Sequence, residues 1–122
     1  MTSYYELVGR EAAMEKAVQI FYRKILKDPL IKHFFTDIDM NLQIKKQKAF
    51  FTLLFGGPNL YSGKDLTLGH AHLVKRGLND SHFNAVANHL KETLEELQLS
   101  SEIMNDIMAK AEAARDAVLG RI

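Results

Sequence analysis

The stretch MNLQIKKQKAFFTLLFGGP, residues 40–58, decides the fold of this chain. Its residues recur at intervals of three and four, which places on one helical face Gln43, Lys46, Gln47, Phe50 and Leu54. Asp39 is the expected N-cap of a helix from Met40 to Phe55, and Gly56-Gly57-Pro58 ends it. The first half of this face is polar and the second half is apolar. Two interpretations stay open, because the polar residues either belong to the solvated surface or line an internal polar pocket.

The rest of the chain also has a helical pattern, and no segment alternates apolar and polar residues as a strand does. Ser3 and Glu6 have the spacing of a capping box for a short first helix. Asp80 and either Ser100 or Ser101 are the expected caps of the last two helices. Besides the helix at residues 40–55, helices are expected at residues 3–9, 11–27, 65–74, 81–97 and 101–120. A capped turn is expected at residues 28–35. The sequence therefore predicts an all-α protein.

Composition sets the broad class of the protein. The 122 residues are 47% hydrophobic, which suits one compact core, so we expect a single domain over residues 1–122. The 16 basic and 15 acidic residues nearly cancel, which argues against nucleic acid or an anionic membrane as a partner. The first residues lack the basic and apolar regions of a secretory leader, and no apolar run reaches membrane-spanning length. We therefore expect a cytoplasmic protein, and a monomer.

The chain contains no cysteine, which excludes disulfides, thiolate metal sites and cysteine nucleophiles and leaves histidine as the obvious transition-metal ligand. His70 is the strongest candidate among five histidines. Its imidazole is expected to point inward, because its helical face also carries Leu66, Leu73 and Val74. His33 stands beside an aromatic pair and His82 at a helix start, so a structural or capping role is expected for both.

Tyr22 lies on the apolar stripe of its own helix, beside Val18 and Ile25. A buried tyrosine hydroxyl needs a hydrogen-bond partner, and an inward Gln43 or Gln47 can supply one. A purely structural hydroxyl is the alternative, and the residues alone leave both interpretations open.

Short motifs follow one another in a specific order and spacing along nearly the whole chain. They are Phe21-Tyr22, Ile25-Leu26, Asp28-Pro29, residues 32–35, residues 43–50, Phe55-Gly56-Gly57, His70 with Leu73-Val74, and His82-Phe83. In this order they resemble a truncated haemoglobin of the group that includes cyanobacterial and algal proteins. The first glycine turn departs from the usual Gly-Gly pair, since it reads Val8-Gly9-Arg10.

The resemblance implies a truncated two-over-two globin fold that encloses haem b. It makes His70 the proximal iron ligand and Phe35 the aromatic residue on the haem face, with Tyr22, Gln43 and Gln47 as the polar set on the distal side. The remaining haem neighbours implied are Phe50, Leu54, Phe55, Tyr61, Leu66, Leu73, Phe83 and Val86. The carboxy-terminal helix holds no histidine, so the haem is expected not to be covalently attached.

Lys46 stands where related cyanobacterial globins place a histidine that binds the iron, and some algal relatives look as though they use a lysine there. A neutral amine is a nitrogen donor, and the positive charge of iron favours the neutral form. We therefore expect Lys46 to coordinate the iron when no external ligand is bound. The alternative is that it bends outward to a haem propionate or to water.

The function implied by the resemblance is binding of O2, NO and CO, with nitric oxide dioxygenation as the expected activity. Turnover would require an electron donor that the sequence does not identify. Reversible oxygen binding or transfer is one alternative, and electron transfer is another. A haem-free helical interaction module is the alternative from a different functional class.

Overall fold

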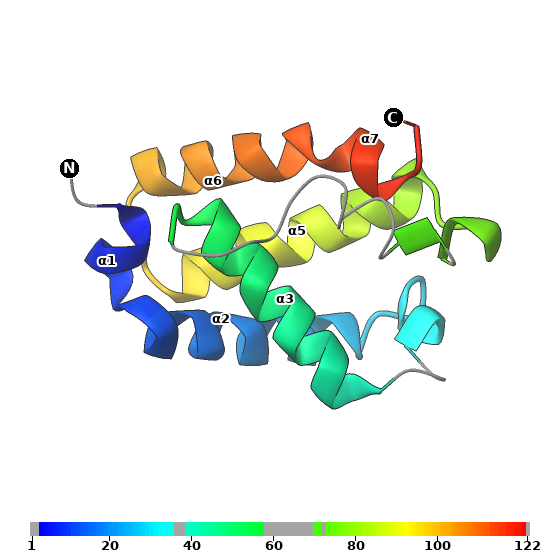
Figure 1. Cartoon of the computed structure of the whole chain (residues 1–122), viewed down its shortest axis with the longest axis horizontal. Coiled ribbons are helices and arrows are strands. Elements are labelled where there is room, and N and C mark those ends of the chain that lie inside the picture. Colours follow the sequence, from blue (N-terminus) through cyan, green and yellow to red (C-terminus); the bar gives the residue numbers. More distant parts are fainter. Residues whose placement is uncertain (1–2, 36–38, 58–69, 72, 122) are drawn as a thin grey trace.

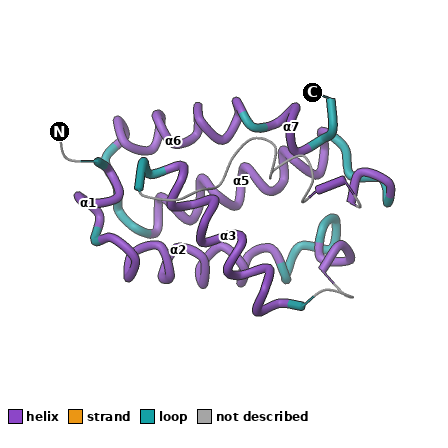
Figure 2. Tube along the Cα trace, viewed as in Figure 1, coloured by secondary structure: helices purple, strands orange, loops and turns teal. Residues whose placement is uncertain are grey.

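The computed structural model describes residues 3–35, 39–57, 70–71 and 73–121. These residues form helices, turns and loops, with no strand among them (Figure 2). The helices are α1 (Tyr4–Val8), α2 (Arg10–Ile25), the 3-10 helix η1 (Lys32–Phe35), α3 (Met40–Leu54), α5 (Asp80–Glu96), α6 (Ser101–Ala113) and α7 (Arg115–Val118). Residues 70–71 and 73–75 are also helical. In the described part of the chain, no helix is both long and apolar enough to cross a membrane.

Four long helices make the body of the fold (Figure 1). Helix α2 packs on both α3 and α5, and α6 packs along α5 and also contacts α3. Short α1 packs on α2 at one end of the molecule, while η1 and the segment 70–78 lie at the other end. The four helices surround one core, whose largest buried side chains include Met14, Phe51, Phe55, Leu94 and Ile107. The described residues therefore have the all-α arrangement that the sequence predicts.

The expected caps account for three helix starts. Ser3 Oγ accepts a hydrogen bond from the Glu6 backbone N–H at 3.2 Å and starts α1. Asp39 Oδ1 accepts from the first turn of α3, and Ser100 Oγ accepts from the first turn of α6. Each of these oxygens satisfies a backbone donor that has no partner within its own helix.

The glycine turn after α3 holds α1 in place. The Tyr5 N–H donates to the Phe55 carbonyl at 2.8 Å, so the first helix is bonded to the end of α3. Gly56 has a φ of +76°, which favours glycine. A Cβ on Gly57 would lie 2.6 Å from Tyr5 Cγ and 2.8 Å from Thr52 Cγ2, so this close approach requires a residue without a side chain. The two glycines thus have different roles.

Several predicted boundaries differ from the structure, and three of the differences have a visible local cause. Helix α2 ends at Ile25 instead of Lys27, because the Lys27 N–H turns back to the Lys24 carbonyl ahead of Asp28-Pro29. Asn79 caps α5 in place of Asp80, and its side chain accepts from the Ser81 N–H. The last helix is split at Ala114, whose N–H bonds to the Ala111 carbonyl in a tighter turn.

Candidate functional site

A partly open cavity lies between α3, the helical residues 70–71 and 73–75, and α5. Its walls are mostly apolar, and each long helix contributes to them. Twenty residues line it: Phe21, Ile25, Ile31, Phe34, Phe35, Gln43, Lys46, Gln47, Phe50, Phe51, His70, Leu73, Leu78, His82, Phe83, Val86, Ala87, Leu90, Ala111 and Val118. The polar members are Gln43, Lys46 and Gln47 on α3 and the two histidines His70 and His82.

The cavity brings together most of the residues that the sequence analysis placed around a haem. Nine of them line it: Phe35, Gln43, Lys46, Gln47, Phe50, His70, Leu73, Phe83 and Val86. The polar half of the α3 face thus borders an internal space, and the solvated-surface interpretation is wrong for Gln43 and Gln47, which are half-buried. Lys46 borders the cavity and is still exposed, so its flexible side chain has access to both environments.

Three expected neighbours are buried and are not among the residues that line the cavity. Leu54 and Phe55 are 2% and 1% exposed, and both belong to the core beneath α3. Tyr22 is 5% exposed, and its ring meets the Phe35 ring edge to face at a centroid distance of 5.8 Å. Tyr22 therefore packs against Phe35, which lines the cavity, and is not itself among the described lining residues. Tyr61 and Leu66 are outside the described residues.

Several wall residues were not predicted, and some of them have a recognisable signal in the sequence. Ile31 and Phe34 come from the short turn before α3, and their apolar character was visible in the sequence. Leu90 follows Val86 by one helical turn of α5, so extending that stripe would have found it. Ala111 and Val118 are on the apolar face of the last helical segment, and only tertiary packing brings that face to the cavity.

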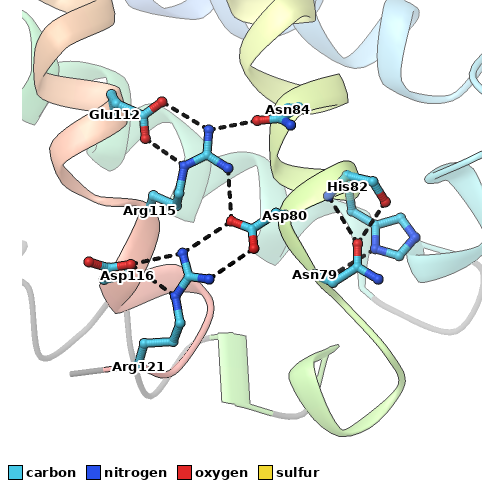
Figure 3. Close-up of polar contacts among 9 residues, drawn as sticks. Asn79, Asp80, His82, Asn84, Glu112, Arg115, Asp116 and Arg121 are labelled. Atoms are coloured by element: carbon cyan, nitrogen blue, oxygen red, sulfur yellow. Dashed lines mark hydrogen bonds and ion pairs between the residues drawn. The ribbon is translucent and has the colours of Figure 1, made fainter.

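His82 has the structural role expected for it, and it also borders the cavity. Its Nδ1 accepts from the Asn79 N–H at 3.0 Å and completes a capping box at the start of α5 (Figure 3). Its ring packs edge to face on Phe34 at 5.0 Å between centroids. Arg76 lies over the same Phe34 ring and donates to the His33 carbonyl at 3.0 Å. These contacts fix the wall where η1 meets α5.

A second polar cluster fastens α7 to the start of α5 (Figure 3). Arg115 donates to Asp80 at 3.0 Å and to Asn84, and Arg121 donates to Asp80 at 2.9 Å. Arg121 and then Arg115 hold the pKa of Asp80 below its usual value. The Arg115 guanidinium also lies 4.5 Å from the centroid of Phe83, which lines the cavity. The cluster therefore supports one wall of the cavity from outside.

His89 is not among the lining residues of the cavity, and it joins α5 to the turn that follows α2. Its Nε2 lies 2.7 Å from Asp28 Oδ2, while Asp28 Oδ1 accepts from the Leu30 N–H at 2.9 Å. These two hydrogen bonds, the one from His89 first, lower the pKa of the Asp28 carboxyl. Asp28 is thus both a turn cap and an anchor for the helix opposite.

The donor set of the cavity fits an iron porphyrin. Such a group needs a wide apolar slot, one nitrogen ligand for the metal and a few hydrogen-bond donors near the remaining coordination position. The cavity offers the imidazole of His70, the amides of Gln43 and Gln47, and aromatic and aliphatic walls.

Comparisons with known proteins agree with this fit. The bacterial-like globin family model matches residues 3–119. The group 1 truncated haemoglobin of Tetrahymena pyriformis is 41% identical over 117 residues, which are 96% of this chain and 94% of that protein. The corresponding protein of Synechocystis sp. is 42% identical over 114 residues, 93% of this chain and 92% of that protein.

Solved structures give the same result. The two-over-two haemoglobin of Synechococcus sp. PCC 7002, in the cyanomet state and with covalently attached haem, has a TM-score of 0.91 to this chain. The two are 37% identical, and the superposition covers 98% of this chain and 100% of that one. Globins bind haem and diatomic gases such as dioxygen. The sequence match, the superposed fold and the donor set of the cavity together show that this chain belongs to the bacterial-like globin family as a truncated haemoglobin.

Proposed function

We propose that this globin binds haem b without a covalent link, holds the iron through His70, and oxidises nitric oxide with dioxygen. The observation that carries the proposal is the meeting of one imidazole with the polar face of α3 in an otherwise apolar cavity. When bound, the haem supplies the iron at which dioxygen is reduced and nitric oxide is oxidised to nitrate. CO is expected to bind at the same position, and a reductant must restore ferrous iron after each turnover.

The amides of Gln43 and Gln47 are proposed to donate hydrogen bonds to a bound ligand. Such donors would stabilise negative charge that develops on a diatomic ligand beside them, if the haem is bound there. Tyr22 is proposed to join them, since its ring packs on Phe35, which lines the cavity together with both glutamines. Support comes from the solved variants of the Tetrahymena pyriformis protein, whose substituted tyrosine and two glutamines have the same mutual spacing as Tyr22, Gln43 and Gln47.

Lys46 is proposed to be the second iron ligand in the absence of an external one. It borders the cavity on the face of α3 that also carries both glutamines. Its side chain is long and exposed, so the amine can reach either the cavity or water. Its amine must lose a proton before it can bind, and the nearby iron charge favours that loss. The observed affinity for an external ligand is then the intrinsic affinity multiplied by the fraction of protein in which Lys46 has moved away.

The haem is proposed to be exchangeable. The Synechococcus neighbour carries covalently attached haem. In this chain the histidine nearest the carboxy terminus is His89, which lies in α5 and is paired with Asp28. Extraction of the haem into acidified butanone tests this proposal, and haem that stays with the denatured protein would contradict it.

The test of Lys46 is an absorption spectrum of the ferric haem-loaded protein from acid to mildly alkaline pH. Wild type is expected to be low-spin near neutrality and to become high-spin on acidification, as the released amine takes up a proton. Lys46→Ala should be high-spin throughout the range below the ionisation of bound water. Lys45→Ala is the matched control, since it removes the neighbouring lysine, which is exposed and outside the cavity lining. Identical spectra for wild type and Lys46→Ala would place Lys46 outside the iron coordination shell.

The test of the activity is the nitrate formed when nitric oxide is mixed with dioxygen-saturated ferrous protein. One nitrate per haem is expected in a single turnover, together with ferric protein. Ferrous protein that fails to bind CO would instead indicate an electron-transfer protein whose two ligands stay on the iron. Protein that takes up no added haemin would leave a haem-free interaction module as the function. Sedimentation of the haem-loaded protein tests the further proposal of a single-domain monomer.

A further inference from the structure

Charge is unevenly distributed along this nearly neutral chain. Between residues 40 and 79 there are six basic residues and a single acidic one, Asp65. That segment has a formal charge of +5, whereas the whole chain has +1, so the remainder has −4. The same segment supplies α3 and the residues 70–78 that border the cavity. The positive charge is therefore concentrated beside the proposed haem site.

The fold gathers this charge at one end of the molecule. The start of α3, η1 and the segment 70–78 lie together at the end opposite α1 (Figure 1). Their exposed basic residues, defined here as the basic rim, are Lys32, Lys45, Lys75 and Arg76. Lys32 directly follows the lining residue Ile31, and Lys45 directly precedes the lining residue Lys46. Arg76 packs on the ring of Phe34, which also lines the cavity.

Within the described part of the chain, the four side chains of the basic rim form no ion pair. Other basic residues on the body of the fold do. Lys48 pairs with Glu11 at 2.8 Å, and Arg121 pairs with Asp80 at 2.9 Å. The polar contact of Arg76 is to an uncharged carbonyl, so its charge is not compensated there. The basic rim therefore keeps its positive charge, whereas basic residues such as Lys48 and Arg121 are paired with carboxylates.

Exposed apolar side chains lie next to these charges. Leu42 is 50% exposed and Ile44 is 39% exposed, and both precede Lys45 on α3. Apolar contacts flanked by complementary charges are typical of protein interfaces, and redox partners form small, short-lived ones. Exposed apolar side chains beside unpaired basic ones are therefore better suited to contact with a protein partner than to exposure to water.

We propose that the basic rim docks an acidic protein that delivers single electrons, one that carries a reduced flavin or an iron–sulfur cluster. The inference rests on the proposed function, because turnover there requires a reductant. One electron leaves the donor cofactor and reduces the iron from ferric to ferrous, while the donor is oxidised by one electron and no bond is made or broken. Lys46 is excluded from the docking surface, since its proposed place is at the iron.

Flavodoxin, an acidic flavin protein, is the probe. Binding of oxidised flavodoxin to the ferric haem-loaded protein is measured by calorimetry, and electron transfer from its hydroquinone by stopped flow. The double variant Lys45→Gln/Lys75→Gln is expected to lower both the affinity and the second-order rate by roughly tenfold at low salt. The control is Lys16→Gln/Lys91→Gln, which removes two exposed lysines outside the basic rim and the same net charge. It is expected to change both by less than about twofold. Added salt should weaken wild-type binding more than binding by the rim variant, which keeps only Lys32 and Arg76 of the four rim charges.

Three results would overturn the docking proposal. Equal losses in both double variants would mean that net charge alone attracts flavodoxin. A rim variant that loses haem would mean that these lysines hold the propionates. No binding of flavodoxin by wild type, with tight binding to phosphatidylserine vesicles, would identify a membrane surface as the partner. Failure of the proposed function is recognised separately, because nitrate formation in a single turnover needs no donor protein.

Discussion

Replacing Gly57 with alanine tests whether the glycine turn holds α1 on α3 by close approach. The new methyl group would lie 2.6 and 2.7 Å from two carbons of the Tyr5 ring and 2.8 Å from Thr52 Cγ2. Ordinary carbon contacts need about 3.5–4.0 Å, so the ring must move by nearly 1 Å. Overpacking of this kind costs about 1–3 kcal/mol, and strain on the Tyr5–Phe55 backbone bond of 2.8 Å adds to it. We expect Gly57→Ala to lower the free energy of unfolding by about 2 kcal/mol.

The assay is the thermal midpoint of the cyanide-bound ferric protein, measured at fixed haem concentration because bound cofactor shifts the midpoint. A loss of about 2 kcal/mol corresponds to roughly 6–10 °C for a chain of this size. In a Tyr5→Ala/Thr52→Ser background both clashing groups are gone, so adding Gly57→Ala should cost less than about 0.5 kcal/mol. Thr52→Ser keeps the hydroxyl that donates to the Lys48 carbonyl. The same cost in both backgrounds would refute the steric explanation.

Three other changes have predicted outcomes. Arg10 has a φ of +59°, so Arg10→Gly should raise the unfolding free energy by roughly 0.5–1 kcal/mol, and an unchanged urea midpoint would contradict this. The depressed pKa of Asp28 stabilises the fold above its usual value of 3.8, and this stability is lost as pH falls through the lower value. Asp28→Asn should therefore be less stable than wild type at pH 7 and should lose less stability below pH 4. If the free energies of unfolding measured in urea fall equally with pH in both proteins, the ion pair with His89 does not stabilise the fold. The hydrogen bond to Asp106 raises the pKa of Tyr4 to about 12, so Asp106→Asn should lower that pKa toward 10 in an absorbance titration at high pH.

Local sequence patterns predicted the helices because their causes are local. The intervals of three and four on α2 and α3 follow from the helical repeat, and the oxygens of Ser3 and Asp39 cap helices within three residues of themselves. The errors were also local. Asp80 is as good a cap by type as Asn79, and only the bond between the Asn79 N–H and His82 Nδ1 distinguishes them. Residue type therefore located helices better than it located their first residues.

The sequence by itself determined an all-α chain and, through the order of its motifs, a likeness to the truncated haemoglobins. Together with that likeness it identified nine of the twenty described residues that line the cavity, among them Gln43, Gln47 and His70. The tertiary structure alone decided that Tyr22 packs edge to face on Phe35. It alone brought Ala111 and Val118 to the cavity and, among the described residues, left the basic rim without an ion pair. These features depend on how helices distant in sequence pack against one another, and the pattern within one helix fixes which face is buried without fixing what that face meets.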